Sequence, residues 1–495
     1  MQFTTIWFWI FFAITFIIYY LGRPTWRWAI LLVASLFFYA QLKAPQLLIA
    51  LFLVTTISYT VGRLLSQIPI GSNKRKRALY IGVLLNILVL ITIRYLPTLR
   101  KSLFPSFEIP NVIITAGVSF YVFQAISYLI DVYYGEQPSE HHLGYFALYI
   151  SFFPKVLQGP IERYSKLLPQ LRHPKALSDE TIQSAFLLIL WGLYKKLIIA
   201  DRLSILVGGV YDNLLEYIGI SLWLATFLYA LQIYCDFSSY TDIAIGVARL
   251  LGIDLSINFN KPYLAISVPD FWRRWHISFS TWIFDYIFKP VQIGIRKLRI
   301  WANPFALLVT FFLSGIWHGA NWGFIIWGLL HGFYMATYAL IAPYEKKFLR
   351  RYKLENSALV RALRMCITFQ LVSFAWIFFR AKTLSDAWYV VSHLFSGFKA
   401  TISLLTDVTN YANAGQGKGL FQPLTFSQSF IDLSFVIAGI IILLIVELPK
   451  NLAETRLGII FKKNLAFRWL IYWLLVMSII LTGVSTQAVF VYFQF

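Results

Sequence analysis

The chain has 495 residues, of which 59% are hydrophobic and 13% are charged, and its mean hydropathy is +0.67. An average soluble domain carries about 25% charged residues, so this composition excludes an ordinary soluble domain and predicts a polytopic membrane protein. The formal net charge of +21 is spread among short connections between apolar segments, so anionic lipid headgroups explain it more simply than nucleic acid does.

The predicted fold is all-α and embedded in the membrane. Because each crossing needs ~20 apolar residues, the sequence accommodates about eleven transmembrane or re-entrant helices, with interfacial helices, around a central funnel or channel. No long polar linker divides the chain, which predicts a single domain over residues 1–495. Cys235 and Cys366 lie far apart in apolar sequence, which predicts buried, inert thiols and neither a disulfide nor a metal site.

The first part of the chain predicts three spans: residues 1–21, a second to about Ala40 and a third from about Gln46. Residues 1–21 have no basic leader, so they are expected to be a retained span and not a cleaved signal peptide. The run SNKRKR at Ser72–Arg77 is expected to be a short cytoplasmic loop facing solvent or headgroups. Counting back from this loop places the N-terminus outside.

Two groups of polar residues interrupt the apolar sequence that follows. Pro154 and Pro160 break any straight helix, which predicts a kinked or re-entrant element lining a cavity, and Glu162 and Arg163 come directly after the break. Further on, Asp236 and Asp242 point to different faces of a helix. Each is expected to pair with a cation such as Arg249, with substrate contact or orientation of a histidine as the alternatives.

Residues 271–299 are too charged to span and too aromatic for open solvent, so we expect them to lie in the cytoplasmic interface. They contain the motif FWRRWH, with His276 at the expected mouth of a pocket. Fixed cations beside flat aromatic faces suit a phosphate-bearing, ring-containing donor. The candidate binding residues here are Trp272, Arg273, Arg274, Trp275 and Ser280.

His318 lies deep in apolar sequence, where an imidazole costs free energy and usually serves a function. The alternative is that it only bonds a neighbouring helix. If the helix continues past His318, Asn321 and Trp322 share its face, and Asn321 is a further candidate substrate-binding residue. On one straight helix His331 would lie about 140° away, so His276 is expected to be its partner in the site.

The C-terminal part begins with a polar stretch at about residues 399–428, which suits an extracytoplasmic loop. The last crossing is expected at residues 469–483, and the tail to residue 495 then lies outside.

Several of these stretches resemble one known family. SFFPKVLQGPIERYSKLLPQL (Ser151–Leu171), YCDFSSYTDIAIGVARLLGI (Tyr234–Ile253) and NFNKPY (Asn258–Tyr263) are similar, in the same order, to the membrane-bound O-acyltransferases. Within them they resemble the bacterial branch of alginate O-acetylation and teichoic acid D-alanylation. The resemblance covers about residues 117–340 and the last residues. It implies acyl transfer, with His318 matching the catalytic histidine and His276 the second polar position of the active site.

The resemblance implies an O-acetyltransferase of the bacterial cell membrane. It would take acetyl from a cytoplasmic thioester, acetyl-CoA, hold no bound cofactor or metal, and act with a secreted SGNH-hydrolase-like transferase on a cell-surface polysaccharide. The ending FVYFQF resembles a signature of this branch, so Tyr492 is either an acyl carrier or an interfacial anchor. The alternatives are D-alanyl transfer from a carrier-protein thioester and a transporter with histidine proton relays.

Overall fold

The computed structural model describes residues 1–42, 44–103, 117–319, 321–396, 430–449, 460–461 and 463–484. Within these ranges the regular structure is helical, and no strand occurs among the described residues. The chain groups into two compact units. The first holds Met1–Leu193 and Ser239–Asn258, and the second holds Tyr194–Ser238 and the described residues between Phe259 and Ala488.

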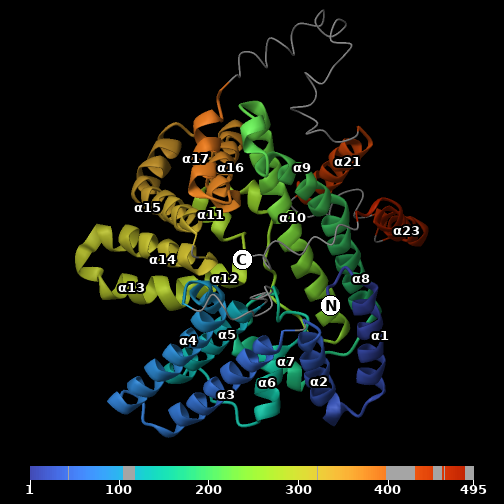
Figure 1. Ribbon diagram of the computed structural model, residues 1–495, viewed down its shortest axis with the longest axis vertical. Helices are drawn as coiled ribbons and strands as arrows, with labels where there is room; N and C mark the ends of the chain where they lie inside the picture. Colours follow the sequence, from blue (N-terminus) through green and yellow to red (C-terminus); the bar gives the residue numbers. More distant parts are fainter. Residues whose placement is uncertain are drawn as a thin grey trace, which may run out of the picture. The chain divides into compact units, whose positions relative to one another are not determined.

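The first unit is built from helices of different lengths (Figure 1). Helices α3, α4 and α5 pack against one another, and α2 packs on α6. Its helices are α1 (Ile6–Leu21), η1 (Pro24–Trp26), α2 (Arg27–Ala40), α3 (Pro45–Gln67), α4 (Asn73–Leu103), α5 (Val118–Tyr134), α6 (Leu143–Ser151), α7 (Tyr164–Arg172) and α8 (Asp179–Tyr194).

The start of α4 differs from the expectation for the basic run. Residues 72–77 were expected to form a loop, but α4 begins at Asn73, so the run occupies its first turn. Arg75 is only 4% exposed because its guanidinium donates to main-chain carbonyls, including those of Val132 and Ile68. One residue of the run is therefore buried and holds helices together, and does not face solvent or headgroups.

The break predicted by Pro154 and Pro160 is confirmed, since the chain leaves the helix at Phe152 and α7 starts only at Tyr164. This irregular backbone is buried and is held by buried side chains. Lys155 Nζ donates to Gln124 Oε1 and to the Tyr149 carbonyl, both at 2.7 Å, and burial lowers the Lys155 pKa to about 7. Glu162 accepts from Ser256 Oγ at 3.0 Å, and burial raises its pKa.

The second unit holds the histidines of interest. Helix α14 runs antiparallel to α15, which packs on α16, and α11 contacts both α15 and α16. The helices are η2 (Lys195–Ala200, a π-helix), α9 (Asp201–Tyr211), η3 (Leu214–Glu216), α10 (Ile220–Leu250, continuing into the first unit), η4 (Pro262–Leu264), α11 (Val268–Trp272), α12 (Ile277–Ile283), η5 (Phe284–Phe288, also π), α13 (Lys289–Gly294), η6 (Arg296–Trp301), α14 (Ala302–His318), α15 (Trp322–Arg351), α16 (Ala358–Arg380), α17 (Leu384–His393), α21 (Phe430–Glu447) and α23 (Leu465–Thr482).

The prediction of an all-α, polytopic membrane protein is confirmed. Among the described residues, eight helices are long and apolar enough to cross a membrane, and α1 and residues 24–40 form two shorter apolar helices. The count of eleven and the central funnel stay predictions. The polar stretch at 399–428 and the tail with Tyr492 lie outside the described residues. Cys235 is buried as expected, but Cys366 is exposed on α16, so the prediction of burial was wrong for that thiol.

The expectation of an interfacial layer over residues 271–299 also needs correction. The segment is a series of short helices, and the aromatic side chains of its first half turn inward. Trp272 is 8% exposed and Trp275 is 1% exposed, because Trp275 stacks on Phe271 at a centroid distance of 5.4 Å and also contacts Trp376. These indoles form part of the core of the second unit.

Candidate functional site

His276 lies at the break between α11 and α12, where it is the N-cap residue of α12. Its backbone is left-handed, with φ 44° and ψ 53°, an uncommon conformation for a residue with a side chain. The ring is 1% exposed and contacts Phe237 at 4.7 Å and Phe279 at 5.1 Å between centroids. Burial lowers the His276 pKa to about 3, so this imidazole is neutral at physiological pH.

The two arginines of the FWRRWH motif are in different environments. Arg274 Nε donates to Asp270 Oδ1 at 2.8 Å, and its carbonyl accepts from Asn260 N at 2.9 Å. Arg273 is exposed. Of these two arginines, Arg273 can therefore bind a ligand directly, whereas Arg274 would first have to break its hydrogen bond to Asp270.

Ser280 and Asn321, both candidate substrate contacts, have hydrogen bonds within the protein. Ser280 Oγ donates to the Trp275 carbonyl at 3.0 Å. Asn321 Oδ1 accepts from Gly323 N at 2.9 Å, which caps α15, and its Nδ2 donates to the Lys382 carbonyl at 2.8 Å. A capping role accounts for Asn321 without any contact to substrate.

His318 is the last residue of α14 and is 4% exposed. Its ring meets Trp317 at 4.4 Å, Trp327 at 4.8 Å and Phe379 at 5.0 Å between centroids. Since α14 ends here, the expected helical continuation to Asn321 and Trp322 was wrong, and Trp322 is 66% exposed. The imidazole is enclosed by aromatic rings from α14, α15 and α16.

The break after His318 also changes the position of His331. Helix α15 turns back along α14, and a Cβ on Gly315 would come within 2.5 Å of the Phe324 carbonyl oxygen, so this approach requires glycine. Trp327 thereby contacts His318 on one side and His331, at 5.1 Å, on the other. The two histidines share a neighbour, contrary to the separation expected for one straight helix.

His331 is fully buried, and its Nδ1 accepts from Trp272 Nε1 at 3.2 Å. A neutral imidazole that accepts at Nδ1 carries its proton on Nε2. This Nε2, and likewise Trp327 Nε1, is buried with no hydrogen-bond partner among the described residues. The sequence prediction left His331 out of the site, whereas in the structure His331 contacts Trp327, which also contacts His318.

A series of aromatic contacts, two stacked and one tilted, connects His276 with His318. His276 stacks on Phe279 at 5.1 Å, Phe279 on Trp317 at 4.5 Å, and Trp317 meets His318 at 4.4 Å between centroids. The prediction that both histidines lie in one region is thus supported by these contacts. Their chemical roles stay predictions.

The second unit also contains a buried ionic cluster, of which the sequence predicted only the pairing of Asp236. Lys196 Nζ lies 2.6 Å from Asp236 Oδ1 and 2.9 Å from Asp201 Oδ1, and these side chains are 2–3% exposed. The prediction that Asp236 pairs structurally is confirmed, with Lys196 as the partner and not Arg249, which pairs with Asp254. Phe237 follows Asp236 in the chain and contacts His276. The ionic cluster therefore helps to position Phe237 against the imidazole.

The chain combines apolar helices long enough to span a membrane with buried imidazoles. It is therefore a polytopic membrane protein with a candidate histidine site in its core. Residues 136–378 match the sequence model of MBOAT, the membrane-bound O-acyltransferase family. The probable alginate O-acetylase of Pseudomonas aeruginosa is 33% identical over 389 residues, covering 77% of this chain and 72% of that protein. The chain therefore belongs to the membrane-bound O-acyltransferase family and is an O-acyltransferase.

Two other relatives have names that refer to different acceptors. The peptidoglycan O-acetyltransferase of Helicobacter pylori is 32% identical over 402 residues, covering 74% of this chain and 73% of that protein. The teichoic acid D-alanyltransferase of Bacillus subtilis is 30% identical over 292 residues, covering 55% and 70%. The match to the acetylating relatives extends over more of the chain.

Proposed function

We propose that this protein is an O-acetyltransferase that passes an acetyl group from a cytoplasmic thioester, acetyl-CoA, toward hydroxyls of a cell-surface polysaccharide. The observation that carries the proposal is the buried His318 at the end of α14, enclosed by aromatic rings. The proposal is also supported by the sequence similarity to the alginate and peptidoglycan acetylating relatives, which extends over about 390–400 residues. The protein lies in the bacterial cell membrane with both termini outside.

In the proposed reaction His318 is the general base. It takes the proton from the attacking hydroxyl, the new ester C–O bond forms as the thioester C–S bond breaks, and the proton passes to the leaving thiolate. Such proton transfer is worth typically ~10²–10⁴ in rate. His276, neutral because burial lowers its pKa to about 3, orients or polarises the thioester through a hydrogen bond and not through charge.

The donor entrance in this proposal is the FWRRWH motif. Arg273, which is exposed, binds the donor phosphates. Arg274 would first have to leave its ion pair with Asp270, in which the two side chains are 2.8 Å apart. The alternative is that these arginines only anchor the segment to lipid headgroups. On the outer side, Tyr492 is the proposed first acceptor, and a secreted SGNH-hydrolase-like transferase takes the acetyl group from its aryl ester.

The test is an assay of the purified protein in nanodiscs with labelled acetyl-CoA, following free CoA and labelled protein. His318→Ala should abolish both signals while the variant inserts and stays monodisperse. His173→Ala, which removes an exposed imidazole, is the matched control and should behave as wild type. Wild-type turnover in His318→Ala would refute the role of this residue.

The second candidate, D-alanyl transfer, is favoured by the similarity to the teichoic acid D-alanyltransferase. A parallel reaction with a D-alanyl carrier-protein thioester separates the two. Label from this donor with none from acetyl-CoA would overturn the acetyl assignment. No thioester cleavage with either donor would instead favour the transporter class.

A further inference from the structure

His331 is a buried imidazole that the proposed reaction does not use, although it contacts the segments that carry the two candidate site histidines. It lies on α15 and is fully buried, and its Nδ1 accepts from Trp272 Nε1 of α11 at 3.2 Å. Its ring also lies 5.1 Å from that of Trp327 and 6.1 Å from that of Phe311 of α14, measured between centroids. One imidazole therefore joins α11, α14 and α15.

The hydrogen bond to Trp272 connects His331 with the segment of His276. Trp272 is the last residue of α11, and His276 is the N-cap residue of α12 after a turn of three residues. Helix α11 has only 5 residues, and so short a helix depends on tertiary packing for its stability. The bond to His331 therefore helps to fix where the chain enters the turn before His276.

Trp327 connects His331 with His318. The Trp327 ring meets the His318 ring edge-on, at 4.8 Å between centroids and 90° between planes. His318 is the last residue of α14, so no further turn of that helix holds its side chain. Because Trp327 contacts both imidazoles, a change at His331 reaches His318 through this one shared neighbour.

The hydrogen bond also defines what a substitution of His331 would remove. Nδ1 accepts, so the neutral ring carries its proton on Nε2, and Nε2 has no hydrogen-bond partner among the described residues. Within that part of the chain, the bond to Trp272 is therefore the polar contact that would be lost. The ring contacts can be kept or removed separately by the choice of replacement.

We propose that His331 is a positioning residue for acyl transfer. It holds Trp272 by a hydrogen bond and Trp327 by ring contact, and so fixes the placement of His276 relative to His318. This inference rests on the proposed acetyl transfer. A misplacement of about 1 Å can cost ~10² in rate, so His331 should affect kcat, whereas a fully buried ring makes no contact with a donor at the entrance.

The experiment measures kcat and KM for acetyl-CoA with the purified full chain in nanodiscs, by release of free CoA. His331→Phe keeps an aromatic ring but removes the acceptor, and Trp272→Phe removes the donor of the same bond. Each should lower kcat by ~10² and change the KM little. The double variant should be no slower than either single variant, because the two changes remove one shared interaction.

His331→Asn separates positioning from proton transfer and serves as the test if His331→Phe does not fold. The Asn Oδ1 can accept from Trp272 Nε1 in place of Nδ1, so this variant should keep more of the wild-type kcat than His331→Phe does. Its kcat should also follow the wild-type pH profile, because a positioning residue does not take up the transferred proton. Loss of a limb of that profile would make His331 the base itself and overturn the proposal.

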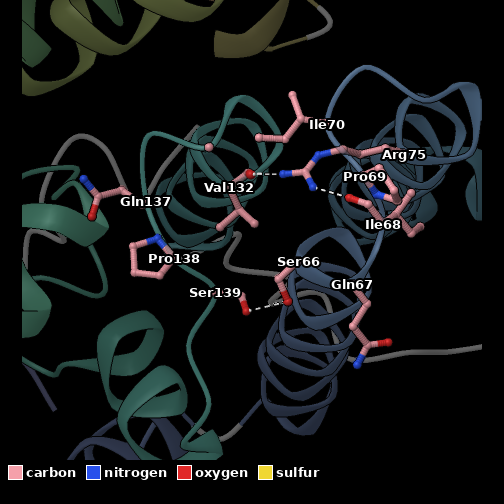
Figure 2. A pocket seen from close by; sticks show the side chains of 11 residues that line it. Ser66, Gln67, Ile68, Pro69, Ile70, Arg75, Val132, Gln137, Pro138 and Ser139 are labelled. Carbon is pink, nitrogen blue, oxygen red and sulfur yellow. Dashed lines mark hydrogen bonds between the residues drawn. The ribbon is translucent and has the colours of Figure 1, made fainter.

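Two control variants remove hydrogen bonds that do not involve the histidines. Tyr211→Phe removes the bond that joins Tyr211 Oη and Thr226 Oγ1 at 3.1 Å in the same unit. Ser139→Ala removes the bond from Ser139 Oγ to Ser66 Oγ at 3.0 Å in the first unit (Figure 2). Both should keep the wild-type kcat, so an equal loss in the controls would show general destabilisation and overturn the proposal.

The remaining outcomes separate this inference from the proposed function. An active wild type with normal kcat in His331→Phe and Trp272→Phe would overturn the positioning role alone. A double variant whose loss is the product of the two single losses would also overturn it, because the two residues would then act separately. Absence of CoA release by the wild type would overturn the acetyl transfer and this inference together.

Discussion

Replacing His276 by glutamine tests whether this imidazole is held neutral inside the protein. Its pKa is lowered from 6.5 to about 3 by burial, so the folded state binds fewer protons than the unfolded state below pH 6.5. Stability is therefore lost as the pH falls from 6.5 toward 3. Between pH 7.5 and pH 5 the loss from this group alone is about 2 kcal/mol, rising to about 5 kcal/mol below pH 3.

The measurement is the free energy of unfolding in mild detergent, by denaturant titration at pH 7.5, 6 and 5. His276→Gln keeps a neutral polar side chain but cannot take up the proton, so its stability should fall by about 2 kcal/mol less than that of wild type between pH 7.5 and 5. His173→Gln controls for the loss of an exposed histidine. Equal pH dependence in wild type and His276→Gln would refute the reasoning.

Three other predictions follow from the site. Arg273→Ala should raise the KM for acetyl-CoA about tenfold, because it removes one charge-assisted hydrogen bond to the donor. Arg274→Ala should raise this KM less. An unchanged KM in both variants would favour headgroup anchoring. Lys196→Met should lower the free energy of unfolding by ~3–5 kcal/mol, because it leaves buried carboxylates unpaired, and adding Asp236→Asn should recover part of this loss in the same denaturant titration. Tyr492→Phe keeps the ring but removes the hydroxyl, so it should eliminate glycan acetylation in cells, and normal acetylation would reduce the tail to an anchor.

The ionic cluster shows how far local sequence can predict a partner. Asp236 stands out as a carboxylate in an apolar helix, and pairing could be expected because an unpaired buried charge is costly. The sequence does not reveal that Lys196 is the partner. That choice depends on the π-helix Lys195–Ala200 packing near α10, a contact between segments about forty residues apart.

What the sequence by itself determined is the membrane class, the apolar helices that begin the chain, the break at Pro154 and the choice of His276 and His318 as candidate site residues. These follow from apolar composition, from the backbone limits of proline and from the cost of an imidazole in apolar sequence. Each is a local property, so it can be read without knowing which segments meet.

Only the tertiary structure decided the neighbours of those histidines. The end of α14 at His318 and the close return of α15 past Gly315 place Trp327 between His318 and His331. Helical periodicity predicted that these histidines would point apart, because it assumes an unbroken axis. Once the chain reverses, the packing of two helices, and not the angle along one helix, determines which side chains meet.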